Sequence, residues 1–99
     1  MQDELKVRWT PSAAKDLKEI TRYIRRDNPA AASAVAKVLY REAEGLNILP
    51  GRGRPGQIPE TRELIVPGLP YIIVYRISGT AIDLLRVYRG ARNWPAPSA

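Results

Sequence analysis

Arginine is the only strong cation in the second half of this chain, and its placement suggests a specific chemistry. Residues 51–99 hold seven arginines and no lysine, against three acidic residues. A guanidinium group binds a carboxylate or a phosphate through two parallel hydrogen bonds, which the lysine ammonium cannot copy. The pattern therefore predicts a surface that grips an anion, built from Arg52, Arg54, Arg62, Arg76, Arg86, Arg89 and Arg92.

Three of these residues, Arg62, Arg76 and Arg86, stand near the ends of predicted strands. If the strands are neighbours, the three guanidinium groups form one cluster that grips a target or anchors the carboxylates of a partner. The alternative is a structural network with Glu63 and Asp83. Because the arginines outnumber the local acids, the sequence favours the functional interpretation.

The remaining arginines lie in less regular segments. Arg52 and Arg54 lie in a glycine-rich stretch, where mobile cations could contact a large target or a nucleic-acid backbone; a solvated charged loop explains them equally well. Arg92 and Trp94 near the C-terminus are candidate target contacts. For Trp94, packing of the last strand against the helices is the better explanation, and Trp9 is similarly expected in the core or at the sheet edge.

Cleavage of RNA would need proton transfer, and arginine is a poor acid or base because it hardly ever loses its proton. The chain has no histidine, and its second half has no lysine. Glu63 could act as a base and Tyr88 as an acid, although an ion pair and an amphipathic strand-end tyrosine are the better explanations. We assign no catalytic residue; the full set of candidates is Glu60, Glu63, Asp83, Tyr71, Tyr75 and Tyr88.

Length and composition narrow the class of protein. The 99 residues suit one domain, residues 1–99, with one modest core. The net charge of +6 is typical of proteins that meet nucleic acid, an acidic protein or an anionic membrane, although it could serve solubility alone. Without cysteine or histidine, the usual zinc sites are excluded, and we expect neither a metal nor a cofactor.

The polar start of the chain and the lack of a long apolar stretch predict a cytoplasmic protein without a membrane span.

The first half predicts a strand and a helical hairpin. Residues 5–9 alternate apolar and polar side chains, as a half-buried strand does. Thr10 with Pro11, and Asn28 with Pro29, are typical pairs of N-cap and first helical residue. We expect helices to begin at Pro11 and Pro29, and the second to end near residue 49. The apolar face of the first helix consists of Ala13, Leu17, Ile20 and Ile24.

The second half predicts a meander of three strands. Residues 50–59 are too rich in glycine and proline for regular structure and are expected to form a loop. Strands follow at 61–66, 71–77 and 81–89, and residues 95–99 form a short irregular tail. The order β-α-α-β-β-β predicts an α+β fold with the helical hairpin packed on one face of an antiparallel sheet. Strand 71–77 is apolar on both faces, so either a partner or the loop covers the second face.

A set of short motifs in order along the chain resembles the RelE/ParE toxin superfamily from about residue 5 to residue 95. Each motif is weak by itself, but their order and spacing together are specific. The motifs are Trp9-Thr10-Pro11, Asp16-Leu17, Tyr23-Ile24, Asn28-Pro29, Leu49-Pro50, Arg54-Pro55-Gly56, Thr61-Arg62-Glu63-Leu64, Val74-Tyr75-Arg76, Leu85-Arg86-Val87 and Ala91-Arg92-Asn93-Trp94-Pro95.

The resemblance implies the toxin of a type II toxin–antitoxin pair, neutralised by a small antitoxin that wraps its surface. RelE-like members cut messenger RNA on the ribosome, and ParE-like members inhibit DNA gyrase by binding. RelE-like nucleases often have lysines where this chain has Arg52 and Arg54, and many relatives have histidine at the position of Arg89. We therefore predict a ParE-like gyrase inhibitor that binds an acidic, amphipathic antitoxin segment. The alternatives are a ribosome-dependent endoribonuclease and an inactive module that only binds the antitoxin.

Overall fold

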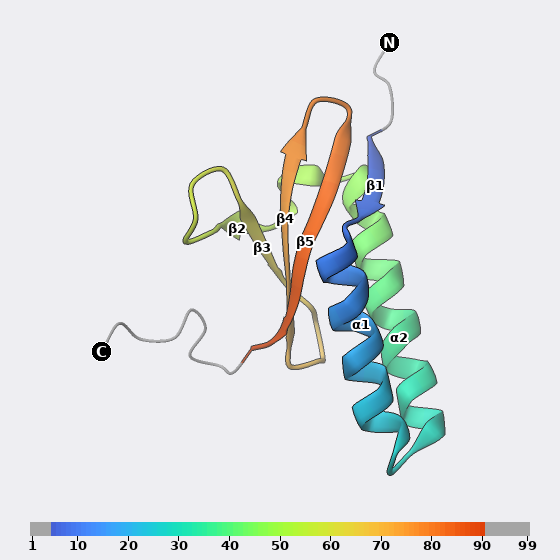
Figure 1. Ribbon diagram of the computed structural model, residues 1–99. Coiled ribbons are helices and arrows are strands. Elements are labelled where there is room, and N and C mark those ends of the chain that lie inside the picture. The colour runs from blue at the N-terminus through green and yellow to red at the C-terminus, as the bar shows by residue number, and fades with distance from the viewer. Residues whose placement is uncertain (1–4, 91–99) are drawn as a thin grey trace, which may run out of the picture.

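The computed structural model describes residues 5–90 and has two layers, a helical hairpin and a five-stranded sheet (Figure 1). The hairpin lies against one face of the sheet, as the sequence predicts. No helix within residues 5–90 is long and apolar enough to cross a membrane. The elements are β1 Lys6–Trp9, α1 Pro11–Arg25, α2 Pro29–Glu44, η1 Gly45–Asn47, η2 Pro50–Arg52, β2 Arg54–Pro55, β3 Arg62–Ile65, β4 Tyr71–Ser78 and β5 Ala81–Arg89, where η denotes a single turn of 3-10 helix.

Both helices begin where the sequence predicts. The hydroxyl of Thr10 accepts a hydrogen bond from the Ala13 N–H at 3.3 Å, and the side chain of Asn28 accepts one from the Ala31 N–H at 3.0 Å. These bonds satisfy backbone donors that the first helical turn leaves without partners. The predicted end of α2 near residue 49 is wrong, because the helix stops at Glu44 and tightens into η1.

The sheet has the strand order β1-β5-β4-β3-β2. The antiparallel meander β3-β4-β5 confirms the predicted strands. At one side of the meander, β1 pairs with β5 in parallel, from Lys6 opposite Ala81 to Trp9 opposite Leu84. At the other side, the two-residue β2 pairs with β3, so the expectation that residues 50–59 lack regular structure is wrong. This stretch contains both η2 and β2.

The core lies between the helices and the sheet face that they cover. It is formed by alternate strand residues and by small or aliphatic helix residues: Ala13, Leu39, Ala43, Leu46, Leu64, Tyr71, Ile73, Tyr75, Ile82, Leu84 and Val87. Tyr75 is fully buried, and its hydroxyl donates to the Pro50 carbonyl at 2.7 Å while accepting from the Gly53 N–H at 2.8 Å. This side chain therefore fixes the glycine-rich segment to the core.

The face of the sheet that points away from the helices, here the outer face, is also partly buried. Val74 on this face is only 8% exposed although no helix covers it. Residues 56–61 form a closed loop in which the Gly56 N–H donates to the Thr61 carbonyl at 2.7 Å. Ile58 of this loop lines a pocket of about 140 Å³ together with Val74 and Leu85, and the Gln57 N–H of the loop donates to the buried Glu63 carboxylate at 3.3 Å. The loop therefore covers part of the second face, as one of the two sequence interpretations expected.

Candidate functional site

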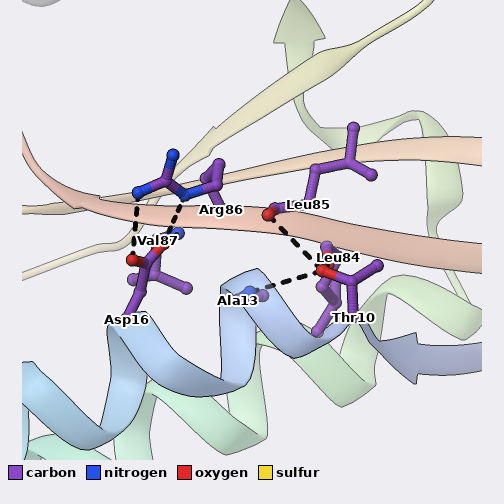
Figure 2. A network of polar contacts seen from close by, with 7 residues as sticks. All are labelled: Thr10, Ala13, Asp16, Leu84, Leu85, Arg86 and Val87. Carbon is purple, nitrogen blue, oxygen red and sulfur yellow. Dashed lines mark hydrogen bonds and ion pairs between the residues drawn. The ribbon is translucent and has the colours of Figure 1, made fainter.

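The second half of β5 loses its strand neighbour where β1 ends. β1 stops at Trp9, opposite Leu84, and the chain turns through Thr10 into α1. The Thr10 hydroxyl donates to the Leu84 carbonyl at 2.7 Å, and the Thr10 backbone N–H donates to the same carbonyl at 3.2 Å (Figure 2). Beyond Leu84, α1 lies beside β5 in place of a strand.

Asp16 of α1 links the helix to this part of β5. Its carboxylate accepts hydrogen bonds from the Val87 backbone N–H at 2.9 Å and from Arg86 Nε at 2.8 Å and Nη2 at 3.1 Å (Figure 2). Burial by itself raises the pKa of Asp16, but the hydrogen bonds from Arg86 and Val87 and the positive charges of Arg86 and Lys15 outweigh it. The pKa of Asp16 therefore lies below its usual value.

Arg86 is held from two sides. The hydrogen bonds and charge of Asp16 raise the pKa of its guanidinium group, which also lies 5.1 Å from the centre of the Tyr88 ring. This distance is typical of a cation–π contact. Arg86 thus binds a carboxylate in the two-point geometry that the sequence predicts for these arginines, but the carboxylate belongs to α1 of the same chain.

Arg8 and Arg76 share one carboxylate on the outer face. Asp83 of β5 lies opposite Arg8 of β1 on one side and Arg76 of β4 on the other. Arg8 Nε and Nη2 lie 2.8 and 2.7 Å from Asp83 Oδ1, whereas Arg76 Nε is 3.8 Å from Oδ2. Asp83 is buried, and both guanidinium groups are more than half exposed. Two cations over one buried anion leave a surplus positive charge at the surface.

The arginines of the glycine-rich segment have structural contacts as well. Arg54 Nε and Nη2 each lie 3.2 Å from Glu63 Oε1, and Arg52 Nη1 lies 2.7 Å from Glu42 Oε1. Arg62 donates to the backbone carbonyl of Gly53 at 2.7 Å. These contacts fold residues 50–54 against the rest of the protein.

The predicted cluster of Arg62, Arg76 and Arg86 does not form. Arg62 lies opposite Tyr75, on the face of the sheet that the helices cover. Arg76 and Arg86 lie opposite Asp83 and Val74, on the outer face. The alternative, a structural network with Glu63 and Asp83, describes only Arg76, which lies 3.8 Å from Asp83. Arg86 pairs with Asp16 of α1, and Arg62 donates to backbone carbonyls. Arg92 and Trp94 lie outside the described residues.

Two of the candidate proton-transfer groups, Glu63 and Tyr75, have structural roles. Glu63 is buried and accepts from Arg54 and from the Gln57 N–H at 3.3 Å. Burial raises the pKa of Tyr75 and outweighs the opposing effects of the Gly53 hydrogen bond, Arg62 and Arg52. Within residues 5–90, no group of three or more acidic side chains gathers where it could hold a metal ion.

Trp9 lies at the sheet edge, as expected. The half-buried indole packs against the core, with its ring centre 5.5 Å from that of Tyr40 in α2. This contact joins β1 to the second helix.

Arg89 occupies a different environment from Arg52, Arg54, Arg76 and Arg86, each of which has a carboxylate partner. It lies at the end of β5 and lines an open groove of about 410 Å³ between α1 and the sheet. Within residues 5–90, no carboxylate lies within ion-pair distance of its guanidinium group. We call this surface the α1–β5 groove; its lining residues are Glu19, Ile20, Tyr23, Tyr71 and Arg89.

Two residues of this region were not singled out as site candidates by the sequence. Tyr23 is 70% exposed and forms one wall of the groove, one helical turn after Glu19 and Ile20. A large aromatic side chain next to the apolar positions Ile20 and Ile24 is the signal that could have identified it. Asp16 gave no comparable signal, because an acidic residue on the polar face of a helix is ordinary.

Comparison with known proteins gives consistent results. Residues 7–94 match the family described as "ParE toxin of type II toxin-antitoxin system, parDE". A protein of Sinorhizobium fredii named "Putative toxin Y4kP" is 41% identical over 90 residues, which cover 91% of this chain and 93% of that protein. A structure titled as the chromosomal ParDE system of P. aeruginosa matches with a TM-score of 0.82 and 26% identity, over 89% of this chain and 98% of the other.

A more distant structure shares the fold. The toxin–antitoxin complex RelBE2 of Mycobacterium tuberculosis matches with a TM-score of 0.57 and 24% identity, over 88% of this chain and 99% of the other. The two structural matches differ clearly in closeness, with the ParDE chain the more similar one.

Proposed function

We propose that this chain, which belongs to the ParE toxin family of type II toxin–antitoxin systems, arrests growth by binding and inhibiting DNA gyrase. In this proposal the chain acts as a single domain in the cytoplasm, and a cognate antitoxin neutralises it. The observation that carries the proposal is the match to the ParE family over residues 7–94.

Two features of the structure support binding over cleavage. The exposed guanidinium groups of Arg8 and Arg76 share one carboxylate, so the outer face keeps a positive surplus for an acidic target surface. Glu63, the best candidate for a base, is buried beneath Arg54 and accepts a backbone hydrogen bond. A general base must be within reach of the hydroxyl from which it takes a proton, and this carboxylate is instead occupied in holding the loop.

A supercoiling assay tests the proposal directly. Purified gyrase, relaxed plasmid and ATP are incubated with increasing amounts of the protein, and we expect supercoiled product to disappear. Adding the cognate antitoxin, which we expect the neighbouring gene to encode, should restore supercoiling. Full gyrase activity at every toxin concentration would contradict the proposal. Codon-positioned cuts in messenger RNA of a translating extract would identify the chain as a ribosome-dependent endoribonuclease instead.

A further inference from the structure

We propose that a row of four cations on α1 binds the phosphate backbone of double-stranded DNA. This row, which we call the α1 stripe, consists of Lys15, Lys18, Arg22 and Arg25. The position of the site rests on the geometry of α1 and its surroundings. The choice of DNA over RNA rests on the proposed function, because gyrase holds DNA while it works.

The spacing of the four residues places them on one side of α1. They follow one another at intervals of three, four and three positions, and residues three or four positions apart are neighbours on the surface of a helix. All four side chains are exposed, whereas the apolar residues Leu17 and Ile20 of the same helix pack against the core. From Lys15 to Arg25 the stripe extends over about 15 Å of helix.

The α1 stripe does not hold the fold together. Within residues 5–90, no carboxylate lies within ion-pair distance of any of its four side chains. The charge of Lys15 helps to lower the pKa of Asp16, but that carboxylate is already bound to Arg86. Glu19, the other acidic residue of α1, lines the α1–β5 groove. Like charges at this spacing on a helix repel one another, so a bound polyanion would relieve a repulsion that the fold itself leaves in place.

The groove beside the α1 stripe suits a phosphate backbone. Lys18 and Arg25 line an open groove of about 490 Å³ between α1 and α2. Much of the remaining lining consists of small side chains, which allow a backbone to approach closely: Ala14, Ala32, Ser33 and Ala36. The two cations therefore stand beside a shallow surface with few bulky groups.

Other anionic partners fit this surface less well. A helix that binds a membrane inserts its apolar face, but that face of α1 is packed against the core. Protein interfaces draw much of their affinity from large side chains, often aromatic, seated in dry pockets, and none of the residues described as lining this groove is aromatic. Binding to a phosphate backbone needs no such anchor, because each neutralised phosphate releases counterions.

The length of the stripe also fits DNA. One strand of the duplex advances about 3.4 Å along the helix axis for each phosphate, so about 15 Å corresponds to about four phosphates. The α1 stripe therefore offers about one cation for each phosphate that it spans. Phosphate contacts of this kind carry no sequence information, so we expect binding without sequence preference.

Fluorescence anisotropy with a short labelled DNA duplex tests the inference on the full-length chain. Contact with four phosphates predicts that binding weakens about a hundredfold when the salt concentration rises from about 50 mM to about 200 mM. Two duplexes of unrelated sequence should bind equally well.

The double variant Lys18→Ala/Arg25→Ala removes two of the four contacts. We expect it to bind at least about tenfold more weakly at about 50 mM salt, and to lose only about tenfold between the two salt concentrations. The matched control Lys6→Ala/Arg41→Ala removes the same charge from β1 and α2 and should keep the affinity and salt dependence of the unmodified protein. All four side chains are exposed, so both variants should fold normally, which circular dichroism verifies.

The outcomes separate this inference from the proposed function. Equal affinity of the stripe variant and the control, or no binding of DNA by the unmodified chain, overturns the inference and leaves gyrase inhibition to the supercoiling assay. Tighter binding of an RNA duplex of the same sequence, or displacement of the DNA by polyglutamate at equal charge, would assign the stripe to another partner and also overturn it. Full gyrase activity alongside stripe-dependent DNA binding would overturn the proposed function only.

Discussion

The carboxylate of Asp16 in α1 accepts a hydrogen bond from the backbone N–H of Val87 in β5, with 2.9 Å between oxygen and nitrogen. Asp16 thereby satisfies a backbone donor of β5. A few residues earlier in β5, pairing with β1 satisfies the backbone groups on this side. The same carboxylate holds Arg86 at the surface of the junction. Asp16 is thus the link between the hairpin and the second half of β5.

Removing the Asp16 carboxylate should destabilise the protein. In Asp16→Ala the buried Val87 N–H loses its acceptor, and we expect the free energy of unfolding to fall by about 1–3 kcal/mol. Asp16→Asn keeps an oxygen for Val87 and should lose less. Urea denaturation measures both, with Asp27→Ala at the exposed end of the hairpin as a control that changes stability by less than about 0.5 kcal/mol. Equal losses in the Ala and Asn variants would contradict this role for the backbone hydrogen bond.

The contribution of the Asp16 charge should depend on pH. Its pKa in the folded protein lies below the usual value, which for an unfolded chain is about 3.9. A depressed folded-state pKa gives stability that is fully present above pH ~4 and is lost as the pH falls through the folded-state pKa. The stability difference between the unmodified protein and Asp16→Asn should therefore be constant near neutral pH and shrink in acid. Urea midpoints from pH 7 to about pH 2.5 measure this; a difference that grows in acid would show that the sign is wrong.

Gly53 should tolerate no side chain. A Cβ at this position would lie 2.7 Å from the Tyr75 hydroxyl oxygen and 3.0 Å from the Glu63 carbonyl oxygen. We expect Gly53→Ala to cost about 1–3 kcal/mol of stability, because the buried ring and the backbone cannot both move aside. Gly51→Ala is the matched control, since nothing lies within 4 Å of its added Cβ. Thermal unfolding of both variants should separate them clearly, and equal melting temperatures would refute the predicted clash.

Arg76 offers the sharpest test of the arginines as target contacts. Arg62 and Arg86 hold the loop and the α1–β5 junction, so their loss would mix stability with function. Arg76 is half exposed, and when it is removed Asp83 still has its ion pair with Arg8. Arg76→Ala should therefore lose less than about 1 kcal/mol of stability. If the outer face meets the target, its inhibition of supercoiling should weaken by about tenfold. Undiminished inhibition would remove Arg76 from the target surface.

Local chemistry made the helix starts and the meander predictable. The Thr10-Pro11 and Asn28-Pro29 pairs determine the helix starts through their own side chains and backbone restrictions, so no distant contact is needed. The strands of the meander are bounded by turn residues and are long enough for their apolar pattern to be read. The end of α2 was missed because its apolar pattern continues into η1, where Leu46 is buried although the helix has ended.

The candidate site was harder to predict, because it depends on register. Whether Arg62 shares a face with Arg86 follows from which residues lie opposite on β4, and from the irregularity between Val74 and Tyr75. Neither the pairing register nor this irregularity can be predicted from the sequence of one strand alone. The α1–β5 groove exists because β1 is shorter than β5, and that mismatch appears only when their parallel pairing is known.

The parallel pairing of β1 with β5 also has a consequence for synthesis of the chain. Arg8 and Asp83 are 75 residues apart and become cross-strand partners only in the finished sheet. This contact cannot form until the chain has been synthesised past Asp83, and such long-range pairing slows folding. β1 therefore stays without its strand partner until β5, residues Ala81–Arg89, has been synthesised.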